Sequence, residues 1–454
     1  MMAISAVLPS RRRRAGRAAG LAGLVMALTL LSGCDYFFGD PEAPPLPGQR
    51  ISVLKMSGSL VIDPTLQQQQ VVLPKPETNT EWPQPGGYSS HAMYHVALGD
   101  NIKTVWTAHI GQSAGDDRAI LAEPISVGGR VFTMDAGATV TAFDVTNGGQ
   151  VWRTDLTPED EDDDLFGGGL TSDGKMLYVS TAYEHMYALD IGTGTVKWDV
   201  DLRMPLRAAP TYSDGRVFIV STDNQVVALA ADDGRKLWTH AGVAPAAALL
   251  GGPAPAVVGP NVVVPLSTGE LLAIRAETGR VLWTESLAGG QRSESLSQLA
   301  DIRGRPVIDR DLVLAVSHSG VTAAIDLSNG RRVWSNNFGG SQGPWAAGDY
   351  VYTLTREGDV VCLTRDQGRI RWVQSLPTFE NMEEKKRPIV WSGPVLAGDR
   401  LVVTGSNSEA YSISPYTGEF LGKIQLPGRS HLEPIIVNGT LLLVLDNADL
   451  IAMR

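Results

Sequence analysis

A short segment that recurs along the 454-residue chain constrains its fold more than any other feature. Each copy runs from small apolar residues through a polar residue beside glycine and ends in tryptophan. The copies read AFDVTNGGQVW (142–152), ALDIGTGTVKW (188–198), ALAADDGRKLW (228–238), AIRAETGRVLW (273–283), AIDLSNGRRVW (324–334), CLTRDQGRIRW (362–372) and SISPYTGEFLG (412–422). The last copy keeps the glycine and loses the tryptophan. Such internal repetition predicts stacked copies of one supersecondary unit.

The residue pattern within one copy predicts two β-strands joined by a tight turn. An apolar run meets a polar residue and glycine, a combination that favours a hairpin with positive φ. The next strand ends in tryptophan, and two further short strands precede each copy, as in PTYSDGRVFIVSTDNQVVALA (210–230). Each unit is therefore a four-stranded antiparallel meander. One such sheet cannot bury both of its faces, so neighbouring sheets must stack, with the indole covering the adjacent sheet.

The number of units predicts a closed ring. Eight units begin near Pro124, Gly169, Pro210, Pro253, Pro306, Pro344, Pro394 and Pro434. The last unit stops after its third strand, while KTVWTAHI (103–110) has the tryptophan of a fourth strand and no strands before it. We expect this N-terminal strand to complete the last unit. The prediction for residues 104–454 is an all-β, eight-bladed β-propeller, a fold whose sheet edges are short and protected.

The N-terminus has the layout of an export signal. Residues 11–17 are basic and residues 18–31 are apolar but too short for a comfortable membrane span. The stretch Leu31-Ser32-Gly33-Cys34 resembles the lipobox of bacterial lipoproteins, which implies a signal peptide over residues 1–33 and a lipid on Cys34. Asp35 leaves open which membrane holds the anchor, because aspartate there tends to retain the lipoproteins of enteric bacteria in the inner membrane.

The region between Cys34 and the propeller divides in two. Residues 34–50 carry the lipidated cysteine and a proline-rich tether. Residues 51–103 form an N-terminal extension without assigned role, in which the indole of Trp82 is expected to pack on the main body. Cys362 is the only other cysteine and occupies a repeat position where small residues stand, so we expect it to be buried. The net charge of −11, with no basic patch outside the signal, argues against nucleic acid as a partner.

The repeat, A-x-D-x-x-[TN]-G-x-x-x-W, resembles the PQQ-like propeller repeats of bacterial quinoproteins over residues 104–454. Two families share it, and the repeat specifies the fold rather than the function. One is the quinoprotein dehydrogenases, which implies a quinone and a calcium ion held by carboxylate and amide oxygens. The acidic run at 159–164 is the candidate cluster, and six successive carboxylates are more typical of a solvated loop. A PQQ-dependent dehydrogenase is the alternative function.

The second family is BamB, the propeller lipoprotein of the outer-membrane β-barrel assembly machinery, the BAM complex. The lipobox, tether and eight-unit propeller are similar to its whole layout. This resemblance implies a non-enzymatic scaffold without cofactor, anchored on the periplasmic face of the outer membrane. It implies binding to the POTRA domains of BamA and to other BAM subunits, and leaves open direct contact with unfolded outer-membrane proteins.

The same resemblance implies three partner-binding residues. Leu206 and Arg207 match a contact loop of the family that ends in Leu-Arg before a blade's first proline. They combine an apolar anchor with a guanidinium, a pairing common at interface hot spots. Asp301 matches a second loop, although Arg303 stands where that loop has its second acidic residue.

Three histidines stand in contexts that do not indicate metal binding or catalysis. His91 and His95 are four residues apart without a third ligand nearby, and His318 lies in a turn without a nucleophile motif. The sequence therefore predicts neither a metal site nor a catalytic triad at these positions.

Overall fold

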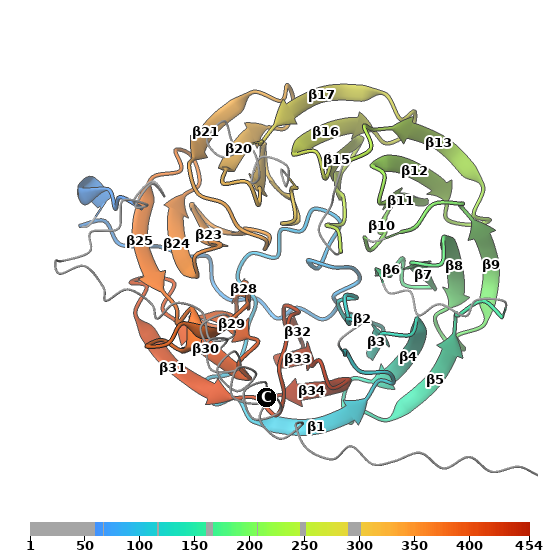
Figure 1. Ribbon diagram of the computed structural model, residues 1–454, viewed down its shortest axis with the longest axis horizontal. Helices are drawn as coiled ribbons and strands as arrows, with labels where there is room; N and C mark the ends of the chain where they lie inside the picture. Colours follow the sequence, from blue (N-terminus) through green and yellow to red (C-terminus); the bar gives the residue numbers. More distant parts are fainter. Residues whose placement is uncertain are drawn as a thin grey trace, which may run out of the picture. The chain divides into compact units, whose positions relative to one another are not determined.

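The computed structural model describes residues 60–66, 68–115, 118–159, 167–206, 208–245, 251–288 and 301–454. The predicted signal peptide, Cys34, the tether, Arg207 and the acidic residues at 160–164 lie outside these ranges. The described part forms eight four-stranded antiparallel sheets arranged as blades around an axis (Figure 1), which confirms the predicted propeller. Within it, no helix is long and apolar enough to cross a membrane.

The blades follow one another along the chain, from the innermost strand of each to the outermost. Blade 1 comprises β2 (Ile125–Val127), β3 (Arg130–Met134), β4 (Thr139–Asp144) and β5 (Gln150–Asp155), and blade 2 comprises β6 (Gly168–Ser172), β7 (Met176–Thr181), β8 (His185–Asp190) and β9 (Val196–Asp201). Blade 3 comprises β10 (Thr211–Ser213), β11 (Arg216–Val220), β12 (Gln225–Ala230) and β13 (Lys236–Ala241), and blade 4 comprises β14 (Ala256–Val258), β15 (Asn261–Pro265), β16 (Glu270–Arg275) and β17 (Val281–Ser286). Blade 5 comprises β18 (Val307–Asp309), β19 (Leu312–Val316), β20 (Thr322–Asp326) and β21 (Arg332–Asn336), and blade 6 comprises β22 (Trp345–Ala347), β23 (Tyr350–Leu354), β24 (Asp359–Thr364) and β25 (Ile370–Ser375). Blade 7 comprises β28 (Trp391–Leu396), β29 (Leu401–Gly405), β30 (Glu409–Ile413) and β31 (Phe420–Gln425), and blade 8 comprises β32 (Ile435–Val437), β33 (Thr440–Val444), β34 (Asp449–Met453) and β1 (Thr104–His109). A short hairpin, β26 (Phe379–Asn381) and β27 (Lys386–Pro388), lies between blades 6 and 7, and a 3₁₀ turn, η1 (Pro64–Leu66), precedes the ring.

The repeated glycine and tryptophan form a staple between consecutive blades. In each repeat the glycine adopts positive φ in the turn between the third and fourth strands, as predicted. The indole of the preceding blade lies directly on that glycine: a Cβ added at Gly194 would stand 2.5 Å from Cε3 of Trp152. Each indole Nε1–H also donates to a backbone carbonyl of the next blade, at 2.8–3.2 Å. The tryptophans concerned are Trp106, Trp152, Trp198, Trp238, Trp283, Trp334 and Trp372.

The ring closes where the sequence predicts. β1 pairs antiparallel with β34, so that the N-terminal strand becomes the outermost strand of blade 8. Two backbone hydrogen bonds between Lys103 and Arg454, each of 2.9 Å, extend this pairing beyond the strands. Trp106 then reaches blade 1 through the same indole contact that joins the other blades.

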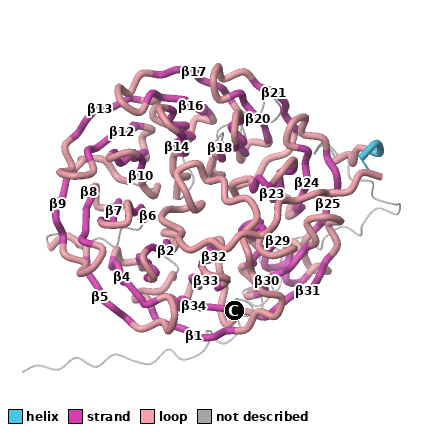
Figure 2. Tube along the Cα trace, turned by 180° about the vertical axis from the view of Figure 1, so that it is seen from behind, coloured by secondary structure: helices cyan, strands magenta, loops and turns pink. Residues whose placement is uncertain are grey.

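Residues 77–98, called here the axial segment, line the centre of the ring as a chain without helix or strand (Figures 1 and 2). The inner strand of a blade has an unpaired edge, and the axial segment supplies partners for those edges. Trp82 and Ser126 of blade 1 exchange both backbone hydrogen bonds, at 2.6 and 2.8 Å. Its contacts reach every blade, through Ser126, Ser172, Tyr212, Val257, Ile308, Trp345, Leu396 and Asn438.

The axial segment gives the N-terminal extension a structural role that the sequence did not reveal. Trp82 is buried, as expected, and its ring stacks on that of Trp345, with centroids 6.4 Å apart. Cys362 is likewise fully buried, in the core between blades. Because one continuous segment hydrogen-bonds to all eight inner strands, it occupies the space that a propeller otherwise leaves as a central channel.

Candidate interaction surface

Topology places the predicted contact loops on one face of the ring. In a four-stranded meander, the turn between strands two and three and the crossover to the next blade lie on the same side. Leu206 and Arg207 belong to the crossover from blade 2 to blade 3, and Asp301 belongs to the crossover from blade 4 to blade 5. The two loops therefore share a face, with blades 3 and 4 between them.

Leu206, which the sequence predicts as an apolar anchor for a partner, is buried in the structure. Its side chain is 0% exposed and packs in the core between blades 2 and 3, against residues such as Tyr178 and Ile219. The backbone forms an antiparallel bridge with Ser221, and the Thr222 N–H donates to the carbonyl of Pro205 at 3.0 Å. By its burial, Leu206 fixes this part of the crossover against blades 2 and 3.

Asp301 is also buried, with 4% exposure. Its carbonyl accepts a hydrogen bond of 2.9 Å from the His318 N–H, which holds the crossover against blade 5. Burial lowers the pKa of the nearby Arg303, and the Asp301 carboxylate opposes this effect.

The structure brings the two loops together at a single small pocket. Asp301 lines it from one crossover and Ala208 from the other, with Asn224 from the blade 3 turn between them. A parallel bridge between Ala208 and Gly252 joins the first crossover to the next one. The enclosed volume is about 10 Å³, room for about one water molecule, so the place where the crossovers meet is not a cleft for a small ligand.

A buried ion-pair cluster crosses the axis near this face. Arg305, from the entrance of blade 5, forms ion pairs with Glu123 of blade 1 and Glu433 of blade 8. Its side chain is 13% exposed. Blade 5 lies across the ring from blades 1 and 8, so the guanidinium spans the axis and holds opposite sides together. Sequence reasoning missed this cluster, although its three residues share one repeat position, directly before the first proline of blades 1, 5 and 8.

Burial shapes the protonation of the groups around Arg305. Burial raises the pKa of Glu123, and Glu433 adds to this rise while Arg305 opposes it. Burial and the Arg305 charge lower the pKa of His91 to about 3. His91 is therefore neutral, and its Nδ1 lies 2.7 Å from the carbonyl of Pro306. Arg305, Glu123, Glu433 and His91 therefore have a structural role at the axis.

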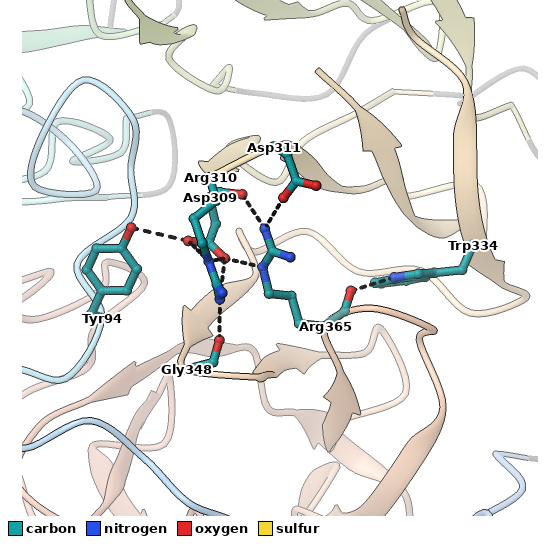
Figure 3. A network of polar contacts seen from close by, with 7 residues as sticks. All are labelled: Tyr94, Asp309, Arg310, Asp311, Trp334, Gly348 and Arg365. Atoms are coloured by element: carbon teal, nitrogen blue, oxygen red, sulfur yellow. Dashed lines mark hydrogen bonds and ion pairs between the residues drawn. The ribbon is translucent and has the colours of Figure 1, made fainter. Parts of the chain in front are cut away.

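A second polar network ties the axial segment to blades 5 and 6 on the opposite face (Figure 3). Arg365 forms ion pairs with Asp309 and with Asp311, the latter at 2.7 Å, and donates to the Asp309 carbonyl at 2.7 Å. Tyr94 of the axial segment donates to the same Asp309 carboxylate at 3.2 Å. Because Arg365 also accepts the Trp334 indole N–H through its carbonyl, the network reinforces one blade-to-blade staple.

The axis does not fit a quinone with a calcium ion. Such a site needs carboxylate oxygens that are open to the ion. The carboxylates of Glu123 and Glu433 are engaged by Arg305, and the axial segment fills the space beside them. Among the described residues, no group of three His, Cys, Asp or Glu side chains could hold a metal ion. His91 and His95 each turn Nδ1 to a backbone carbonyl instead.

Together the sheets define an eight-bladed propeller whose axis is filled by the axial segment and whose two predicted contact crossovers share one face. Comparison with known proteins then assigns the family. The family model described as "Outer membrane protein assembly factor BamB" matches residues 103–374, and the chain belongs to this family. The BamB of Salmonella typhimurium is 25% identical over 92% of this chain and 94% of its own, and that of Escherichia coli is 26% identical over 75% and 86%.

Solved structures of low sequence identity share the fold. BamB from Moraxella catarrhalis superposes with a TM-score of 0.65 at 19% identity, over 78% of this chain and all of that one. Quinohemoprotein alcohol dehydrogenase from Comamonas testosteroni gives 0.63 at 13% identity, over 82% and 80%. A fold shared by scaffolds and dehydrogenases leaves the function to be argued from the sites.

Proposed function

We propose that the protein is a non-enzymatic, lipid-anchored subunit of the outer-membrane protein assembly machinery, on the periplasmic face of the outer membrane. In this proposal it binds BamA POTRA domains through the face that carries the two crossovers. Membership of the BamB family supports the machinery. The observation that carries the binding role is the meeting of the crossovers of Leu206 and Asp301 at one pocket.

Each crossover residue has a separate part in the proposed interface. Leu206, buried beneath the loop, positions it; Arg207, next in sequence, supplies the charged contact. Asp301 anchors the second crossover beside it. Arginine is enriched among the residues that dominate interface energies. The role of Cys34 as the lipid attachment site belongs to the same proposal.

The test is photo-crosslinking in cells from position 207, with mass spectrometry of the captured protein. The matched control places the crosslinker at Asp232, an exposed residue in a turn on the opposite face. A BamA adduct from 207 alone supports the proposal. Capture from neither position by a folded, anchored protein would remove the crossover face from the interface.

A binding measurement complements the crosslink. Arg207→Glu is expected to weaken binding to purified POTRA domains by about 30-fold, the effect of losing roughly 2 kcal/mol at a hot spot. Asp232→Lys, a charge reversal on the other face, should leave binding unchanged. Equal affinities for wild type and Arg207→Glu would contradict the assigned contact.

A further inference from the structure

One of the eight junctions between blades lacks the tryptophan staple. Gly422 stands in blade 7 where the other repeats have tryptophan. The receiving turn is missing too, because blade 8 joins its third and fourth strands only through the paired segments at Lys103 and Arg454. A Cβ added at Gly422 would meet no atom within 4 Å, so the position of the absent side chain is open space.

A cavity of about 280 Å³ lies at this junction. Blade 7 lines it with Val402 and Leu421, blade 8 with Leu441, Leu443 and Met453, and Ile102 closes one side. A protein cavity of about 150 Å³ lined by apolar side chains is known to bind benzene. The larger cavity here, next to a missing indole, has the size for an aromatic ring and apolar walls from both blades, and its lining also includes the charged residues Asp100, Asp399, Arg400 and Lys423.

The outer strand beside the cavity exposes apolar side chains. Phe420 is 45% exposed and Leu421 57%, and Ile424 is exposed on the same strand, β31. β31 is the edge of its sheet, so one row of its backbone groups can pair with another chain. The protein already uses the neighbouring edge in this way: the Asp63 N–H donates to the carbonyl of Ile370 on β25, at 2.9 Å.

The size and charge of this surface favour an extended peptide over a second copy of the protein. β31 has six residues, and one strand with one inserted ring covers far less than the roughly 800 Å² per partner of a stable interface. Two copies with a net charge of −11 each would also repel one another. A single extended segment bound transiently matches both constraints.

We propose that the cavity between blades 7 and 8 receives an aromatic side chain from an unfolded outer-membrane β-barrel precursor whose backbone pairs with β31. The identity of this partner rests on the proposed function. Strands of such barrels alternate apolar and polar residues and carry aromatic girdles near their ends. The inserted ring takes the place that an indole takes at the other seven junctions.

The test measures binding of a fluorescent ten-residue barrel-strand peptide that has tryptophan near one end, together with a copy that has alanine instead. The wild-type protein is expected to prefer the tryptophan peptide by about 10-fold or more, because burying half of the ring's roughly 150–250 Å² is worth about 2–3 kcal/mol, more than the roughly 1.4 kcal/mol of a tenfold change. Gly422→Trp fills the cavity from within and should abolish that preference. Val151→Trp, which adds an indole on the exposed outer strand of blade 1, should retain it.

Each outcome decides the question. Equal affinity of wild type for both peptides, or an unchanged preference in folded Gly422→Trp, overturns the proposal. Should Gly422→Trp fail to fold, Gly422→Leu serves as the filled variant, and a crosslinker at position 421 must capture barrel precursors in cells. Capture of BamA from 207 without precursors from 421 rejects the cavity while leaving the proposed function intact. No BamA adduct from 207, with the peptide preference present, removes the crossover face from the proposed BamA interface and leaves the cavity as a peptide-binding site.

Discussion

The staple between blades can be tested by adding one methyl group to a repeat glycine. In Gly194→Ala, the new Cβ would lie 2.5 Å from the Trp152 ring and 2.7 Å from Oγ1 of Thr154. Alanine at a φ of +72° costs about 1–2 kcal/mol by itself. Displacing the indole removes part of the 150–250 Å² that it buries, and losing half costs about 2–3 kcal/mol. The free energy of unfolding should therefore fall by about 3–5 kcal/mol.

A second glycine separates the two contributions. Gly215 has nearly the same φ, +74°, and a Cβ there would meet nothing within 4 Å. Gly215→Ala should lose only the backbone part, about 1–2 kcal/mol. Urea unfolding of both variants, followed by tryptophan fluorescence and circular dichroism, gives the comparison. If both variants lose the same stability, the glycine serves the turn alone and the indole contact does not hold the blades together.

Three further perturbations test the axis and the staples. Arg305→Met should cost about 3–5 kcal/mol, because it leaves the carboxylates of Glu123 and Glu433 buried without a cation; adding glutamine at both acidic positions should restore much of the loss in urea unfolding. Because the pKa of His91 is lowered in the folded protein, the unfolded chain binds more protons than the folded protein below pH 6.5. The free energy of unfolding therefore has its full contribution from His91 at pH 7 and loses it progressively towards pH 3. Between pH 7 and pH 5 the decline should be about 2 kcal/mol, and unfolding of His91→Phe at the two pH values should show a slope smaller by that amount. Trp283→Phe removes one indole hydrogen bond to the next blade and should lower stability by at least about 1 kcal/mol, measured in the same way.

The ring was predictable because its information is local and repeated. A glycine and a tryptophan at fixed spacing define a hairpin and its contact with the next blade. Because the pattern occurs in seven copies, the assignment of strands does not depend on any single copy. The incomplete last unit and the orphan strand at 103–110 then had one consistent solution, which the pairing of β1 with β34 confirms. The axial segment has no repeat or period, since its hydrogen bonds are set by eight different inner strands.

The contact surface was harder to predict because burial in a crossover depends on the blades around it. The sequence predicts an apolar anchor at Leu206, yet its side chain packs in the core between blades 2 and 3. The meeting of two crossovers at Ala208 and Asp301 follows from ring geometry, which no local pattern encodes. The sequence shows that the repeat ending at Gly422 lacks its tryptophan, but only the structure shows the cavity at that junction.

The shared last blade has a consequence for the order of folding. Blades 1 to 7 each consist of consecutive strands, whereas blade 8 pairs residues such as His109 and Asp449, which are 340 positions apart. Closing so long a loop costs only slightly more entropy than closing a shorter one, but folding slows as contacts become less local. During synthesis from the N-terminus, β1 must wait until the final three strands emerge. Until then the flanks of blades 1 and 7 stay uncovered, and this interval is when the chain most needs protection from aggregation.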